Sequence, residues 1–241
     1  MTLLECGDVR KSFGGIHALD RVSLFVDEAE ILGLVGPNGS GKSTLINVLS
    51  GFFPADGGRA SLAGVNLLEL EAHEVAAEGI ARTFQIPRPF PTMTARENVA
   101  VSYMFGQHKH SLASARQAAD YWLEFTGLAN VADSDVGELN LQQLKFLELA
   151  RALATEPKLL LLDEVLAGLN PSEIEQSITM IRRIHEQGIT LVIVEHVLRA
   201  VMSLSDRIVV LDQGRVIATG DPRAVMQDEA VVAAYLGGKK I

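Results

Sequence analysis

Short apolar runs recur along this chain, and polar or helix-like stretches separate them. Residues 31–35, 159–162 and 189–194 are runs of this kind, and the second of them is four consecutive leucines. A strand that is buried on both faces lacks the alternation of a half-exposed strand, so these runs predict buried strands of the parallel type. Helix-like segments alternate with them, which predicts an α/β fold.

Antiparallel strand pairs are predicted near both ends of the chain. In residues 1–30, short apolar pieces lie on either side of a Gly14-Gly15 turn. Residues 207–219 predict a second pair, which turns at Asp212-Gln213-Gly214. Between the two pairs, residues 60–68 have a strand-like pattern and residues 69–78 a helical one.

A proline-rich segment marks a change of pattern in the middle of the chain. Residues 87–93 contain three prolines, so this segment is predicted to be a loop and a domain boundary. Residues 94–135 are mostly helical in pattern, with Gly127 as a helix stop. We interpret an apolar stripe in this segment as core: Tyr121, Trp122, Phe125 and Leu128.

A further helix is predicted to begin after residue 170. Asn170 is a suitable N-cap, Pro171 suits the first helical position, and Glu173 lies in the first turn. Gly188 follows the predicted end. One face of this helix is apolar and consists of Ile174, Ile178, Ile181 and Ile184.

The apolar run at residues 31–35 leads directly into a glycine-rich segment. Residues 36–44 match the phosphate-loop pattern Gly-x-x-x-x-Gly-Lys-[Ser/Thr], and a helix-like stretch that ends near Gly51 follows. Strand, loop and helix occur in the order that a phosphate loop requires. A glycine-rich turn that binds no ligand would not require this order, so the pattern favours a phosphate loop. The motif consists of Gly36, Pro37, Asn38, Gly39, Ser40, Gly41, Lys42, Ser43 and Thr44.

Each part of this loop suits a nucleoside triphosphate. The glycines allow backbone N–H groups to turn toward a polyphosphate, and the helix N-terminus adds partial positive charge. Lys42 would reach the β- and γ-phosphates, Ser43 would ligate Mg²⁺, and Thr44 would hold a phosphate oxygen. The sequence therefore predicts a protein that binds a nucleoside triphosphate.

The composition fits one sizeable α/β domain with an appended lobe. The chain has 241 residues, of which 48% are apolar. No apolar stretch is long enough to span a bilayer, and the first residues lack the layout of a signal peptide. The single cysteine, Cys6, rules out an internal disulfide framework and suits a reducing cytoplasm. A net charge of −9 argues against a nucleic-acid-binding surface.

Acidic residues follow the leucine run at the predicted ligand-binding edge of the sheet. Asp163 would hold Mg²⁺, and Glu164 would orient or deprotonate the attacking water. His196 follows the next predicted strand, and from the same edge it could contact the γ-phosphate. A lone histidine is more often structural, and Gln85 before the proline-rich loop carries no meaning alone.

Taken in order, these pieces resemble the nucleotide-binding subunit of an ATP-binding cassette (ABC) transporter over essentially the whole chain. The matching set is Phe13, residues 36–44, Gln85, a degenerate signature at residues 139–143 with Ala150-Arg151-Ala152-Leu153 after it, Asp163-Glu164 and His196. The resemblance implies a P-loop NTPase core of the RecA type with an N-terminal antiparallel β subdomain and an inserted α-helical subdomain. The core with its β subdomain would span residues 1–88 and 152–241, and the helical subdomain residues 89–151.

The resemblance also implies roles that the residues alone do not. The ligands would be ATP and Mg²⁺, with Phe13 stacked on adenine. Gln85 would bind Mg²⁺ and water and link them to a membrane partner. Asn140, Gln142 and Gln143 of the signature would contact the γ-phosphate of ATP bound to a second subunit, so that two subunits enclose two ATP molecules head to tail.

Finer matches are similar to importers of branched-chain amino acids, other amides and urea. They lie in residues 82–91, 94–99, 167–171 and 210–222. This branch implies transmembrane permease subunits, a separate substrate-binding protein, and a peripheral position on the cytoplasmic face of the membrane. A related branch energises lipopolysaccharide export, which is an alternative to amino-acid import.

Departures from the family pattern leave other hypotheses open. The usual signature is Leu-Ser-x-Gly-Gln, whereas this chain has Asn140 and, in place of the glycine, Gln142. Val165 stands where proline is usual, and Asn170 where aspartate is usual. The protein could therefore bind ATP but hydrolyse it poorly, or pair with a paralogous subunit that carries most of the turnover. A cassette ATPase without a membrane partner would require a longer insertion than residues 94–138 provide.

Overall fold

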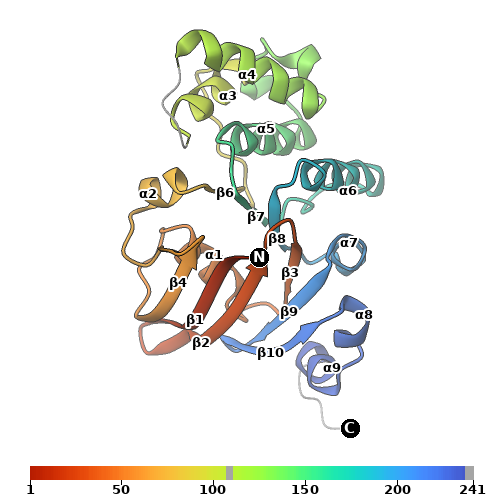
Figure 1. Cartoon of the computed structure of the whole chain (residues 1–241). Helices are drawn as coiled ribbons and strands as arrows, with labels where there is room; N and C mark the ends of the chain where they lie inside the picture. Colours follow the sequence, from red (N-terminus) through yellow and green to blue (C-terminus); the bar gives the residue numbers. More distant parts are fainter. Residues whose placement is uncertain (107–110, 237–241) are drawn as a thin grey trace.

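The structure, a computed structural model, describes residues 1–106 and 111–236, and its strands form two sheets (Figure 1). One sheet is antiparallel with the order β2-β1-β4-β5. The other has the order β10-β9-β3-β8-β7-β6 and is parallel except for its edge strand β10. The strands are β1 (Thr2–Phe13), β2 (Ile16–Asp27), β3 (Ile31–Val35), β4 (Gly57–Leu62), β5 (Val65–Asn66), β6 (Ile80–Arg82), β7 (Leu159–Asp163), β8 (Thr190–Val194), β9 (Arg207–Asp212) and β10 (Arg215–Gly220).

The helices lie around the parallel sheet and at both ends of the molecule. In Figure 1, α3, α4 and α5 gather at the top, and α8 and α9 lie at the opposite end. The helices are α1 (Lys42–Leu49), α2 (Ala72–Ala77), α3 (Ala95–Met104), α4 (Leu112–Phe125), α5 (Leu141–Ala154), α6 (Pro171–His185), α7 (Leu198–Leu204), α8 (Pro222–Val225) and α9 (Glu229–Leu236), with short 3₁₀ turns at Ala129–Val131 and Val136–Glu138. Within the two described ranges, no helix is both long and apolar enough to cross a membrane.

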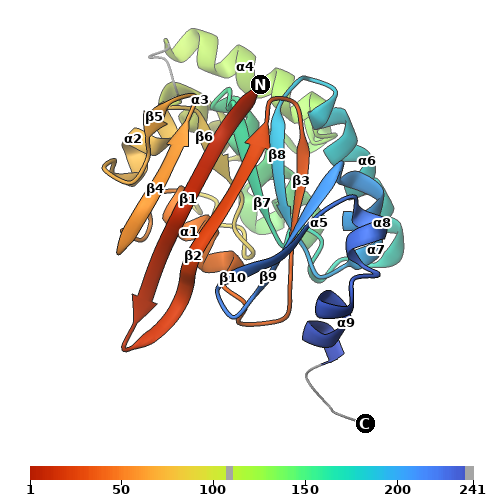
Figure 2. The ribbon, with the colours of Figure 1, turned by 60° about the horizontal axis from the view of Figure 1, so that its bottom comes forward.

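The apolar runs are buried on both faces, as their lack of alternation predicts. Leu159 and Leu161 of β7 pack toward α1 and the antiparallel sheet, whereas Leu160 and Leu162 pack toward α5, α6 and α7. Figure 2 shows β1, β2 and β4 as a separate layer in front of the strands of the parallel sheet. One sheet therefore supports two apolar layers, which fixes the ends of its strands in space.

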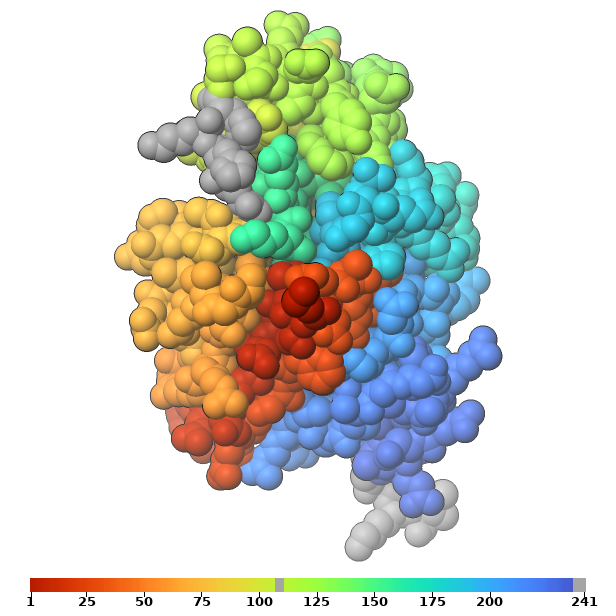
Figure 3. Space-filling view, in the orientation of Figure 1, coloured from red at the N-terminus to blue at the C-terminus, as the bar shows by residue number. Residues whose placement is uncertain are grey.

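Strand β3 lies at the centre of the parallel sheet, between β8 and β9. Both neighbours come from the last third of the chain. The strand that leads into the phosphate loop is therefore hydrogen-bonded on both sides to residues that are distant in the sequence. On the molecular surface the N-terminal strands, in red and orange, lie between the α2 region and the blue C-terminal elements (Figure 3).

Helix α5 belongs to two apolar clusters. Leu147 and Ala150 pack with α3 and α4, and Leu149 and Leu153 pack with the parallel sheet and α6. The predicted boundary between residues 151 and 152 falls within this helix, and the division into subdomains stays a prediction. The sheets and the inserted helices agree with the predicted α/β architecture.

Most predicted elements are present, and the differences have physical causes. Residues 60–68 form the β4–β5 hairpin rather than one strand, because Ala63 and Gly64 adopt positive φ angles and turn the chain. The prediction that Tyr121 is core is wrong, since its side chain is 53% exposed. Helix α4 instead buries Leu123 with alanines one and two turns earlier, and Tyr121 packs edge-on against Trp122. Residues 107–110 of the predicted helical stretch lie outside the described residues.

Candidate active site

The phosphate loop connects β3 to α1 through two glycines that no other residue could replace without strain. The φ angle is +145° at Gly36 and +108° at Gly41. A Cβ atom at Gly36 would lie 2.0 Å from the carbonyl oxygen of Leu211, and one at Gly41 would lie 2.5 Å from that of Ala18. Close packing and backbone conformation therefore both require glycine here.

The loop leaves hydrogen-bond donors available at the N-terminus of α1. Gly41 is the N-cap and supplies no side-chain cap, so the first amides of the helix have no partner inside it. Within residues 1–106 and 111–236, the hydroxyls of Ser43 and Thr44 make no hydrogen bond. Asn38 and Gly39 are exposed at the tip of the loop. Free amides at a helix N-terminus form an anion-binding site.

The Lys42 ammonium lies inside the loop and is only 5% exposed. Its Nζ donates to the carbonyl oxygens of Gly36 at 2.8 Å and Pro37 at 3.0 Å, and Ser40 Oγ is 3.5 Å away. Burial lowers the pKa of Lys42, and the carboxylates of Glu164 and Asp163 oppose this shift. A phosphate in the loop would offer this cation a stronger, charge-assisted partner than its present carbonyl groups.

Asp163 is the last residue of β7 and is buried beside the loop. An Arg82 NH2 group lies 3.3 Å from Asp163 Oδ2, and the same guanidinium donates to Asn47 at 2.7 Å and Ser50 at 3.0 Å. Burial raises the pKa of Asp163, while the positive charge of Arg82 lowers it. Arg82 had no predicted role in the site. The available indication was a basic residue at the end of the short apolar strand β6.

The side chains assigned to Mg²⁺ fit that ion chemically. Ser43, Gln85 and Asp163 offer a hydroxyl, an amide and a carboxylate oxygen, and oxygen donors are the ligands that Mg²⁺ prefers. In the described part of the chain, no three His, Cys, Asp or Glu side chains gather as an all-protein metal site. This suits Mg²⁺, which keeps waters and phosphate oxygens among its ligands.

Glu164 is the point at which three loops of the parallel sheet meet. Gln85 Nε2 donates to Glu164 Oε2 at 2.5 Å, and His196 Nε2 lies 2.8 Å from Oε1. With Glu164 ionised, both neighbours donate hydrogen bonds to its carboxylate. The structure thus brings together the three predicted catalytic residues, which follow β6, β7 and β8. Glu164 itself has a φ of +51°, and its N–H donates to Val194 O at 2.9 Å.

Comparison with models of known protein families shows to which family this chain belongs. The family model described as "ABC transporter" matches residues 19–167, which cover more than half of the chain and include the phosphate loop, Gln85, the signature and Asp163-Glu164. The chain belongs to the ABC transporter family. It is therefore an ATP-binding cassette ATPase. A second model, "Branched-chain amino acid ATP-binding cassette transporter", matches residues 215–240.

Relatives resemble this ABC cassette along nearly its whole length. It is 37% identical to the high-affinity branched-chain amino acid transport ATP-binding protein BraF of Pseudomonas aeruginosa, over 98% of each chain. It is 36% identical to the corresponding protein LivG of Salmonella typhimurium, again over 98% of each chain. These likenesses confirm the predicted family.

Solved structures of ABC cassettes share the fold. A nucleotide-free cassette from an ABC transporter superposes with a TM-score of 0.87 at 34% identity, covering 98% of this chain and 100% of the other. A cassette in its ADP conformation gives 0.89 at 34% identity, covering 98% and 99%. A dimeric post-hydrolysis cassette bound to ADP and Pi gives 0.82 at 27% identity, covering 92% and 99%. The predicted fold class is confirmed.

Phe13 of this ABC cassette presents an exposed aromatic ring at the end of β1. Phe53 supports it from the side, with ring centroids 5.3 Å apart and planes at 72°. Lys11 Nζ lies 5.3 Å from the ring centroid. An exposed, supported ring of this kind can stack on a base, and its assignment to adenine stays a prediction.

The signature residues of this ABC cassette form the N-terminus of α5. Asn140 Oδ1 accepts the Gln143 N–H, and Gln143 Oε1 accepts the Asn140 N–H, both at 2.9 Å, which is a capping box. Gln142 Nε2 donates to Gln176 Oε1 of α6 at 2.7 Å. Asn140 and Gln143 therefore stabilise a helix end, and the neighbouring helix holds the long side chain of Gln142. Phosphate contact by these residues stays a prediction.

We expect Asn140→Ala to destabilise the protein and Asn140→Ser to leave it nearly unchanged. Alanine cannot accept the Gln143 amide, whereas serine is an equally good N-cap. The loss for alanine should be about 1 kcal/mol of unfolding free energy. Urea unfolding monitored by circular dichroism measures both variants. Equal stability of the alanine and serine variants would show that Asn140 does not cap α5.

Three charged side chains behind the site were not predicted. Lys145 and Glu148 of α5 and Glu195 after β8 are 5%, 6% and 4% exposed. Burial raises the pKa of each glutamate to about 7, although Lys145 opposes both shifts. Burial also lowers the pKa of Lys145. Charges three residues apart within the apolar α5 were visible in the sequence, but nothing there showed that they would be enclosed.

Proposed function

We propose that this chain is the ATP-hydrolysing subunit of an importer for branched-chain or other amino acids or related amides. The observation that carries the hydrolytic part is the hydrogen-bonded group of Gln85, Glu164 and His196 beside the phosphate loop. Glu164 takes the proton of the attacking water, and His196 and Gln85 hold its carboxylate in place. Lys42 and the loop amides bind the β- and γ-phosphates.

Mg²⁺ would be held by Ser43, Asp163 and Gln85, and when bound it neutralises phosphate charge. Arg82 stands beside Asp163, and its positive charge opposes the rise in the pKa of that carboxyl that burial causes. Asn47 and Ser50, which accept the other hydrogen bonds of Arg82, fix that guanidinium relative to α1.

The importer assignment is supported by the relatives. BraF and LivG carry names of branched-chain amino acid transport, and the model that matches residues 215–240 has the same description. A chain of this class works at the cytoplasmic face of the membrane with transmembrane permease subunits and, indirectly, a substrate-binding protein. We propose the same arrangement here, rather than lipopolysaccharide export.

A second nucleotide-binding subunit completes the ATP sites. The dimeric cassette bound to ADP and Pi provides a precedent for this assembly. We propose a head-to-tail pair in which residues 139–143 contact the ATP of the partner. Because Gln142 departs from glycine, we favour a paralogous partner over a second copy of this chain.

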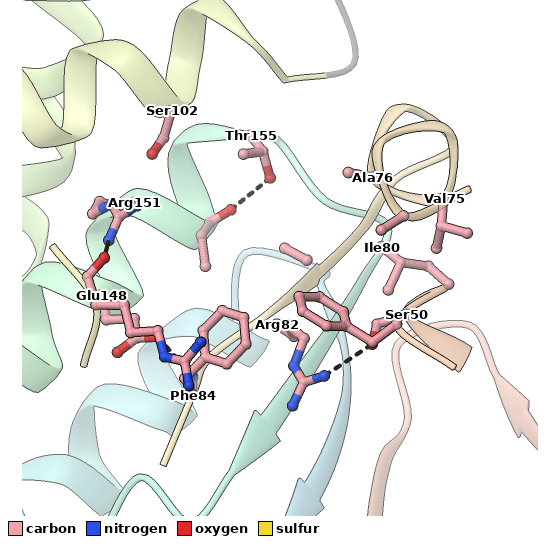
Figure 4. Close-up of a pocket in the computed structure, with 15 residues that line it drawn as sticks. Ser50, Val75, Ala76, Ile80, Arg82, Phe84, Ser102, Glu148, Arg151 and Thr155 are labelled. Atoms are coloured by element: carbon pink, nitrogen blue, oxygen red, sulfur yellow. Dashed lines mark hydrogen bonds between the residues drawn. The ribbon is translucent and has the colours of Figure 1, made fainter. Parts of the chain in front are cut away.

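A cavity between the nucleotide-binding core and the inserted helices is our candidate for the permease contact (Figure 4). Its volume is about 330 Å³, and α2, β6, α3 and α5 contribute to its walls. Arg82, Arg88 and Arg151 line it together with Glu148, so its charged lining is mainly cationic. Phe52 and Phe84 add apolar surface. An amphipathic permease segment with an acidic residue would fit this lining.

Filling this cavity should release the permease without weakening nucleotide binding. We expect Ala76→Trp to reduce copurification with the permease at least about tenfold, since the indole would occupy the space that a partner needs. Ala77→Trp is the matched control, because Ala77 is exposed on the same helix and does not line the cavity. Copurification and ATP affinity are measured for both variants. Equal copurification of the two would place the permease contact elsewhere.

The importer assignment is tested with the assembled transporter. The chain is co-expressed with the membrane subunits encoded beside it, reconstituted in vesicles and supplied with ATP. We expect ATP-dependent movement of labelled leucine, isoleucine or valine toward the nucleotide side when the cognate binding protein is present. Movement in the opposite direction, or movement of lipid alone, would overturn the assignment. Movement of urea or a short amide instead would redefine the substrate within it.

A further inference from the structure

A buried group of three charges lies directly behind the hydrolytic site. We call it the ionic support; it consists of Lys145, Glu148 and Glu195, all of them nearly inaccessible to solvent. The positive charge of Lys145 acts on both carboxylates, and that of Arg151 acts on Glu148 from the next turn of α5. Buried charges are retained only when they are paired and hydrogen-bonded, so the contacts of this group show what it holds.

Each member of the ionic support is hydrogen-bonded to a loop that carries a site residue. Lys145 Nζ donates to the backbone carbonyl of Glu164 at 3.2 Å. Glu195 Oε1 accepts the N–H of Leu166 at 2.7 Å, and Glu195 is itself the residue before His196. Glu148 Oε1 accepts the N–H of Phe84, next to Gln85, at 2.6 Å. The three loops that meet at the Glu164 carboxylate are thus also joined behind it.

The backbone of Glu164 shows why such support is needed. Its φ of +51° lies in the left-handed region, which residues with a Cβ atom disfavour. A conformation of this kind persists when surrounding contacts over-determine it. Here Val194 O accepts the N–H of Glu164 on one side, and Lys145 donates to its C=O on the other.

We propose that Lys145 is a positioning residue that holds the Glu164 carboxylate in its hydrolytic position and ties it to α5. The proposal rests on the proposed role of Glu164 as the base. Lys145 lies within about one and a half turns of Asn140 and Gln142, so any movement of the N-terminus of α5 is transmitted to the Glu164 peptide of the same subunit. Lys145 does not touch the water or the nucleotide.

Lys145→Met is the direct test, in the full-length chain assembled with its partner subunits. Methionine keeps the apolar length and removes the donor. We expect kcat for MgATP hydrolysis to fall about 10²-fold, since a displacement of about 1 Å of a reacting group has an effect of this size. The affinity for ATP should change less than about twofold. Lys145→Arg should restore most of the rate, because a guanidinium can donate to the same carbonyl.

A second variant separates positioning from simple loss of stability. Lys145→Met leaves buried carboxylates without their cation and is expected to lower the Tm. The double variant Lys145→Met with Glu195→Gln removes one of these charges while keeping an acceptor for the Leu166 amide. It should regain thermal stability but not kcat. Recovery of kcat together with the Tm, or equal losses of kcat and ATP affinity, would overturn the proposal. Lys158→Met is the control, since Lys158 is exposed at the other end of β7.

Glu164→Gln distinguishes failure of this proposal from failure of the proposed function. If Glu164→Gln is inactive but Lys145→Met hydrolyses ATP normally, only the positioning role is wrong. If Glu164→Gln retains full hydrolysis, the role of Glu164 as base is wrong, and with it the basis of this proposal. When both roles hold, adding Lys145→Met to Glu164→Gln should cause little further loss, because the two residues act through one carboxylate.

Discussion

Lys42→Ala is expected to abolish tight ATP binding. The ammonium lies within the phosphate loop on the Gly36 and Pro37 carbonyl groups, where it would transfer to the β- and γ-phosphates. The remaining loop amides are uncharged donors and cannot replace a full positive charge. Loss of two charge-assisted hydrogen bonds at about 1.5–3 kcal/mol each corresponds to a loss of affinity on the order of 10²–10⁴-fold.

The measurement is calorimetric titration of the purified variant with MgATP. Circular dichroism must first show a folded protein, since Lys42 also holds the loop in the absence of nucleotide. Lys158→Ala controls for the loss of one positive charge at an exposed position. Wild-type affinity in a folded Lys42→Ala sample would contradict the assignment of residues 36–44 as the phosphate site.

Glu164→Gln should stop hydrolysis while leaving ATP binding intact. The amide has the shape of the carboxylate and can remain hydrogen-bonded to Gln85 or His196, but it cannot accept the proton of the attacking water. Loss of a general base typically slows the reaction by about 10²–10⁴-fold. Because the γ-phosphate then persists, the variant should accumulate as an ATP-bound dimer, which size-exclusion chromatography would detect.

Glu186→Gln is the control for this substitution, because Glu186 is an exposed acid after α6. A hydrolysis rate like that of the wild type in Glu164→Gln would mean that another group activates the water. His196 would then be the first candidate, since its imidazole lies beside Glu164 at the same edge of the parallel sheet. His196→Ala in both backgrounds would resolve the two roles.

The parts of the fold that the sequence predicted are those with a local cause. The leucine run of β7, the Asn170 cap of α6 and the glycines of the phosphate loop each require only neighbours in the chain. For the same reason, Asp163 and Glu164 were recognised at a strand end. Their approach to Gln85 and His196 followed from parallel strands that share one edge.

The parts that sequence reasoning missed depend on contacts between distant segments. Arg82 matters because β6 pairs with β7 and brings it to Asp163. Lys145 is one of three charged residues in the sequence of α5, and only the packing of that helix on the sheet encloses it. Tyr121 was misplaced because it lies outside the buried face of α4, although its neighbours Trp122 and Phe125 pack against the core.

The central position of β3 has a consequence for protein synthesis. Its neighbours β8 and β9, and Leu211 against Gly36, are translated about 150 to 170 residues after the phosphate loop. At about 5–20 residues per second, this delay is on the order of 10–30 s. During that interval the nascent chain already contains the motif but lacks the strands that shape it. A ribosome-bound chain should therefore gain ATP affinity only after β9 has left the exit tunnel.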